Sequence, residues 1–110
     1  MDNPYIQVMT TTATPEDAER IAQALVERRQ AACVQIVGPI RSIYHWQGNV
    51  ENGREWLCLA KSRQDLYPQI EATIRSLHPY EVPEILALPV TAGSASYLAW
   101  LEQAVGAPGG

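Results

Sequence analysis

The densest group of side chains that could bind a ligand lies in one short segment, His78-Pro79-Tyr80-Glu81-Val82-Pro83-Glu84. It holds one of only two histidines in the chain, together with a phenol and two carboxylates. Its two prolines restrict the backbone, so these side chains would lose little entropy on binding. Imidazole and carboxylate groups suit Cu(II) or another divalent cation. The segment therefore predicts a metal site of His78, Glu81 and Glu84.

These residues also have plain structural interpretations. His78 follows a predicted helix, so its ring could instead bond the last helical carbonyls. Glu81 and Glu84 could lie in a solvated turn and pair with Lys or Arg. Lys61 is the only lysine and ends a predicted strand just before a helix N-terminus, where an anion could bind. An exposed strand-end charge is the alternative for Lys61, and the residues alone leave both interpretations open.

The sequence offers little for catalysis. It contains no glycine-rich phosphate loop, no nucleophile elbow and no HExxH motif. His45 and His78 are the only imidazoles, and nothing indicates an activated serine beside either of them. We therefore expect a binding or structural protein rather than an enzyme.

Composition narrows the partners and the compartment. With 46% hydrophobic and 18% charged residues, the chain is typical of a globular protein. The net charge is −4 and the basic residues are scattered, which argues against a nucleic-acid partner. No apolar run is long enough for a membrane span, and the N-terminus does not resemble a signal peptide. We expect a cytoplasmic protein with no membrane partner, in which Cys33 and Cys58 are reduced.

The elements that position the segment alternate between strands and helices. Hydrophobic patterns, caps and turn residues predict strands at 5–12, 32–46, 54–61 and 84–90, and helices at 14–30, 62–77 and from 94 onward. The β-α-β-β-α-β order with a C-terminal helix predicts an α+β, ferredoxin-like sandwich whose helices cover one sheet face. We expect one domain at residues 1–105 and a flexible tail at 106–110.

The predicted hairpin, residues 32–61, is longer than a small four-stranded sheet needs. Gly38-Pro39 predicts a bulge or an edge position in its first strand, and turn residues occur at 47–49 and 52–53. The hairpin carries more large apolar side chains, among them Tyr44, Trp46 and Trp56, than one layer of helices can cover. Such surface predicts a homo-oligomer formed partly by strand addition at the sheet edges.

Between Val8 and Leu101 the chain resembles the CutA family of divalent-cation tolerance proteins. Four segments at these separations carry the resemblance: Ala31-Ala32-Cys33-Val34, Ser42-Ile43-Tyr44-His45-Trp46-Gln47-Gly48, His78-Pro79-Tyr80-Glu81-Val82-Pro83-Glu84-Ile85 and Tyr97-Leu98-Ala99-Trp100-Leu101. The resemblance implies a ferredoxin-like homotrimer with the architecture of PII-type proteins. It also implies that the hairpin strands extend across neighbouring subunits.

The resemblance also implies a link to copper and other divalent cations at clefts between subunits. Residues 78–84 would line such a cleft, with Lys61 and Tyr80 as ligand-contacting residues. We expect five aromatic residues at the trimer interface: Tyr44, Trp46, Trp56, Tyr97 and Trp100. Where some copper-binding members carry a cysteine and a second histidine, this chain has Thr10 and Leu77.

Three functions follow as expectations. The first is divalent metal binding and metal tolerance by a cytosolic trimer. The second is a PII-like sensor that binds an anionic metabolite at the cleft between subunits, through Lys61 and the adjacent helix end. The third is a trimeric scaffold that docks other proteins.

Overall fold

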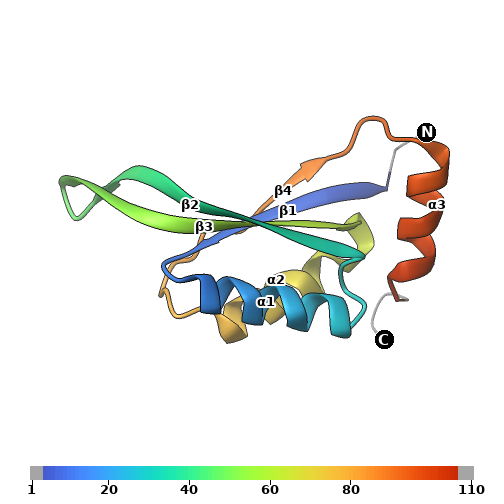
Figure 1. The fold of residues 1–110 in the computed structure, drawn as a ribbon, viewed down its shortest axis with the longest axis horizontal. Helices are drawn as coiled ribbons and strands as arrows, with labels where there is room; N and C mark the ends of the chain where they lie inside the picture. The colour runs from blue at the N-terminus through green and yellow to red at the C-terminus, as the bar shows by residue number, and fades with distance from the viewer. Residues whose placement is uncertain (1–3, 107–110) are drawn as a thin grey trace.

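The computed structural model describes residues 4–106. They form one antiparallel sheet of strand order β2-β3-β1-β4, with α1 and α2 on one face and α3 at one end (Figure 1). The elements are β1 (Tyr5–Thr12), α1 (Pro15–Glu27), β2 (Cys33–Trp46), β3 (Asn49–Arg63), the 3-10 helix η1 (Gln64–Leu66), α2 (Tyr67–Leu77), β4 (Leu86–Pro89) and α3 (Ala95–Ala104). This order confirms the ferredoxin-like α+β prediction. No helix within the described range has both the length and the apolar character of a membrane span.

The core lies between the helices and the sheet. Alternate residues of β1 point toward the helices, and Ile6 and Val8 are buried there. α1 begins as predicted: the Thr14 side chain accepts a hydrogen bond from the Asp17 N–H (3.1 Å), and Pro15 occupies the first turn. The fully buried side chains that join the two helices to the sheet include Ile21, Leu25, Ile70 and Ile74.

The start of α2 differs from the prediction. Ser62 does not cap a helix; it is buried in β3, where its hydroxyl donates to the Gln30 carbonyl at 2.6 Å. The chain then passes through η1, and α2 places Pro68 in its first turn. A capping pattern is local, and here the strand ladder and a long-range hydrogen bond outweigh it. As predicted, α2 ends at Leu77, before His78.

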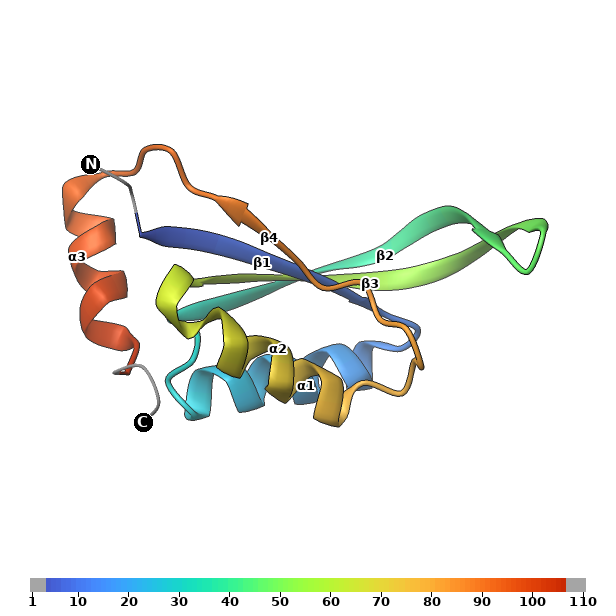
Figure 2. The same ribbon diagram turned by 180° about the vertical axis from the view of Figure 1, so that it is seen from behind.

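β2 and β3 form a long arm, residues 40–55, that extends beyond the helix layer (Figures 1 and 2). Its tip is a two-residue turn of Gln47 and Gly48, both with positive φ, which is the geometry that suits a tight hairpin. The turn predicted at residues 52–53 is wrong, since Asn52 pairs with Ile43 inside the ladder. β3 therefore begins at Asn49 rather than near residue 54.

A bulge separates the arm from the rest of β2, as the Gly38-Pro39 pair predicted. The register moves by one residue between Val37 and Ile40. A Cβ atom on Gly38 would stand 2.2 Å from Cδ1 of Trp56. Glycine is therefore required here, because the indole ring lies against the bare backbone.

Arg63 fastens α3 to the sheet. Its guanidinium donates to Glu102 of α3 (2.8 Å), to the Gly106 carbonyl (2.8 Å) and to Asp65 (3.0 Å). The Gly106 N–H donates in turn to the Arg29 carbonyl. The tail predicted from residue 106 thus starts with a residue held at both backbone polar groups, and residues 107–110 lie outside the described range.

We expect Gly38→Ala to destabilise the protein by about 1–3 kcal/mol, because the added methyl group overlaps the Trp56 ring. Chemical denaturation would measure the loss. Gly53→Ala is the matched control, since a Cβ there meets nothing within 4 Å. The penalty should shrink in a Trp56→Leu background, and an equal penalty in both backgrounds would contradict the packing argument.

Candidate functional site

A cleft of about 730 Å³ opens between the arm and the segment that joins α2 to β4. Its volume lies within the usual range of ligand pockets. The lining residues come from β1, from the arm and from the predicted segment: Thr11, Ser42, Ile43, Tyr44, Trp46, Glu55, Tyr80, Glu81, Val82, Pro83 and Glu84. Most of the segment singled out from the sequence therefore borders this cleft.

Strand alternation presents the arm's side chains to the cleft. Ser42, Tyr44 and Trp46 are two residues apart and so share one face of β2. Glu55 stands opposite Ile40, which lies on that same face. The cleft side of the arm is therefore aromatic and acidic.

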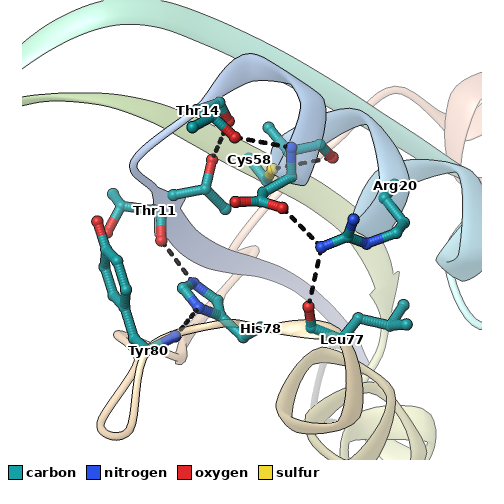
Figure 3. Close-up of polar contacts among 10 residues, drawn as sticks. Thr11, Thr14, Arg20, Cys58, Leu77, His78 and Tyr80 are labelled. Carbon is teal, nitrogen blue, oxygen red and sulfur yellow. Dashed lines mark hydrogen bonds and ion pairs between the residues drawn. The ribbon is translucent and has the colours of Figure 1, made fainter.

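His78 is buried and both of its ring nitrogens are used within the chain. Nε2 lies 2.7 Å from the Thr11 carbonyl oxygen, and the Tyr80 N–H donates to Nδ1 at 3.1 Å (Figure 3). Because a carbonyl can only accept, Nε2 carries the proton and Nδ1 offers its lone pair to the amide. Neither nitrogen has a lone pair left for a cation in this conformation.

Tyr80 connects the segment to the arm. Its hydroxyl donates to Glu55 at 2.8 Å, and its ring centroid lies 4.6 Å from that of His78. Burial raises the pKa of the Tyr80 phenol well above its ordinary value, and the bond to the Glu55 carboxylate raises it further. The phenol thus stays a neutral donor and fixes the position of Glu55.

The charged groups in the cleft lining are all acidic. Glu55, Glu81 and Glu84 line it, and no lysine or arginine does. The Glu81 and Glu84 side chains are exposed, and no ion pair engages them within residues 4–106. Such a lining attracts cations and disfavours an anionic ligand.

Lys61 lies away from the cleft, on the sheet face opposite α1 and α2. It stands in register with Cys33 and Gln7, and its ammonium group donates to Gln35 at 2.9 Å. The structure therefore does not bring Lys61 and Tyr80 together into one site within a single chain.

The predicted metal ligands are likewise not gathered in one chain. Within residues 4–106 no group of three or more His, Cys, Asp or Glu side chains is arranged to hold a metal ion. Glu81 and Glu84 line the cleft, whereas His78 is turned inward to Thr11. The role of His78 here is to hold the segment, and ligation by the two glutamates remains a prediction.

The five predicted interface aromatics occupy three places. Tyr44 and Trp46 are about half exposed on the cleft side of the arm, and Trp56 packs against Gly38. Tyr97 and Trp100 form a ring pair on α3, 5.5 Å apart and also about half exposed. Their contact with another subunit remains a prediction.

Sequence reasoning did not single out Glu55 or Thr11 as part of this site. In β3, Gly53 pairs with Ser42 on the cleft side of the arm. Because alternate residues of a strand share a face, a correctly placed β3 would have put Glu55 on the cleft side as well. Thr11 contributes its backbone carbonyl to His78, and no side-chain pattern indicates that contact.

We expect the Tyr80 phenol to stay protonated at about pH 10, where an ordinary tyrosine ionises. Because its pKa is raised on folding, its stabilising effect is complete below about pH 10 and is lost as the pH rises further. Tyr80→Phe should cost about 1 kcal/mol at neutral pH and make the alkaline loss of stability less steep. Ultraviolet absorbance titration of wild type and Tyr80→Phe would measure the ionisation, and Glu55→Gln should lower the pKa of Tyr80. If Tyr80→Phe removed absorbance that appears near pH 10 in the wild type, Tyr80 would ionise like an ordinary tyrosine and the prediction would be wrong.

Comparison with known proteins agrees with the geometry. Residues 6–104 match a family model described as CutA1 divalent ion tolerance protein. The chain is 46% identical over 99 residues to the divalent-cation tolerance protein CutA of Thermus thermophilus, covering 90% of this chain and 96% of that protein. It is 46% identical over 86 residues to Protein CutA of Homo sapiens, covering 78% of this chain and 48% of that protein. The chain thus spans about half the length of this human relative.

Solved structures give the same result. A divalent cation tolerance protein (Cut A1) of Thermus thermophilus superposes with a TM-score of 0.90 at 45% identity, covering 93% of this chain and 99% of that one. CutA1 of the psychrotrophic bacterium Shewanella superposes with a TM-score of 0.92 at 37% identity, covering 97% of this chain and 100% of that one. With its sequence, its fold and the segment of residues 78–84 all in agreement, the chain belongs to the CutA1 divalent ion tolerance family.

Proposed function

We propose that this protein is a non-enzymatic homotrimer that contributes to metal tolerance by binding divalent cations at the acidic cleft. The observation that carries the proposal is the charge of the cleft: three carboxylates line it and no basic residue does. Cu(II) is one candidate, and cations that prefer oxygen ligands are others.

Glu81 and Glu84 are the proposed ligands. Their segment is held at one end by His78, which bonds to Thr11, and by Tyr80, which bonds to Glu55. Pro79 and Pro83 restrict the backbone of the segment. Two carboxylates on a restrained backbone can hold a partly hydrated cation, with water supplying the remaining ligands.

Trimer formation is supported by the surface that one chain leaves uncovered. β2 and β4 are the two edges of the sheet, and both are free to pair with another strand. On the face opposite α1 and α2, Leu86 and Leu88 of β4 are about half exposed. Exposed apolar side chains beside a sheet edge are typical of a subunit interface.

The cytoplasmic location is also a proposal. A related Arabidopsis thaliana protein is named chloroplastic, and a structure from Archaeoglobus fulgidus is titled periplasmic. Members of the family are thus named for several compartments.

We expect Glu81→Gln combined with Glu84→Gln to weaken cation binding by roughly tenfold or more, since the change removes two ligands and two negative charges. Calorimetric titration with Mn(II) and Cu(II) would measure the affinity. Glu16→Gln with Glu19→Gln on α1 removes the same charge outside the cleft and should leave binding unchanged. Equal heats from wild type and the cleft variant would count against the site.

Sedimentation at low micromolar concentration should give a mass three times the 12.2 kDa of the chain. Obligate interfaces of this kind can bury more than about 2,000 Å² and resist dissociation at such concentrations. A predominantly monomeric species would count against the proposed assembly.

A further inference from the structure

Two arginines face each other across the arm, and within residues 4–106 neither of them forms an ion pair. Arg41 of β2 and Arg54 of β3 are directly opposite in register, a position where like charges destabilise a strand pair. Arg54 lies over the Trp56 ring, 5.8 Å from its centroid. The ion pairs found within residues 4–106 involve other arginines.

The arm has two faces of opposite charge. The face toward the cleft carries Tyr44 with Glu51 opposite it, and Glu55. The reverse face carries Arg41 and Arg54. His45, its cross-strand partner Val50 and Trp56 lie on the same face as the two arginines. Val50 is 68% exposed, so this basic face also has apolar surface that one chain leaves in water.

Glu81 and Glu84 cannot neutralise the arginines of their own chain, because they lie on the other side of the arm. Glu81 and Glu84 border the cleft, whereas Arg41 and Arg54 point away from it. Within residues 4–106, two arginines without an ion pair and two glutamates without an ion pair therefore lie on opposite sides of the arm. A second copy of the chain can satisfy both.

We propose that the Arg41–Arg54 pair of one subunit docks against the Glu81 and Glu84 carboxylates of the next. Arginine and carboxylate can form two parallel hydrogen bonds, which fix orientation as well as charge. The contact is head to tail, because the arm of each subunit meets the cleft of its neighbour, and three such contacts close a ring. The inference rests on the homotrimer of the proposed function. It also makes the arginines competitors of a divalent cation for the same carboxylates.

Charge reversal tests the contact. The arm variant carries Arg41→Glu and Arg54→Glu, the cleft variant carries Glu81→Arg and Glu84→Arg, and a combined variant carries all four changes. The reversals must be combined in one chain, because a ring of three cannot alternate two kinds of subunit. Glu16→Arg with Glu19→Arg on α1 is the control with the same charge change as the cleft variant.

Subunit exchange between labelled and unlabelled protein, followed by native mass spectrometry, measures the strength of assembly. We expect each double reversal to speed exchange by roughly tenfold or more, and the combined variant to return to within about threefold of wild type. The control should exchange like wild type. Even if the arm variant alone fails to fold, the combined variant restores opposite charges and still decides the question.

Two results would overturn the inference while leaving the trimer intact. One is a trimeric wild type whose arm and cleft variants both exchange at the wild-type rate. The other is a combined variant whose subunits exchange as fast as expected when the effects of the two double reversals simply add. A monomeric wild type would instead overturn the assembly, and this contact with it.

Discussion

The inward-facing ring of His78 joins three parts of the chain that are distant in sequence. It follows the last turn of α2, reaches the end of β1 through the Thr11 carbonyl, and accepts the Tyr80 N–H. Buried polar groups are stable only when paired, so this ring fixes where the chain can go after the helix. Tyr80 then reaches Glu55 on the arm. One wall of the cleft is thus tied to the other through two side chains.

Within this short segment, some side chains hold the backbone in place and others are available to a ligand. His78 and Tyr80 use their polar atoms inside the protein, whereas Glu81 and Glu84 point their charges to solvent. Carboxylates presented from a restrained backbone are available to a cation or to a cationic side chain. The acidity of the cleft is the property that both partners would use.

Local signals in the sequence predicted much of the fold. Thr14 and Pro15 identify the start of α1, and His78-Pro79 identifies the end of α2, because caps and prolines act within a few residues. The errors occurred where distant contacts decide: Ser62 belongs to a strand because it bonds Gln30, and Asn52 is paired with Ile43. The position of the site was predictable from residues 78–84. The inward orientation of the histidine was not, since it depends on a carbonyl 67 residues away.

The bulge at residues 38 and 39 determines which side chains of β2 lie on each face of the arm. Before it, the odd-numbered residues of β2 share the sheet face of Leu57; after it, the even-numbered residues do. If the strands paired without the bulge while keeping both residues, β2 would slip by one position against β3, and Arg41 and His45 would face the cleft in place of Tyr44 and Trp46. The part of β2 before the bulge and the part in the arm therefore follow different alternation. Substitutions in the arm can change its surface without disturbing the packing of the core part of the strand.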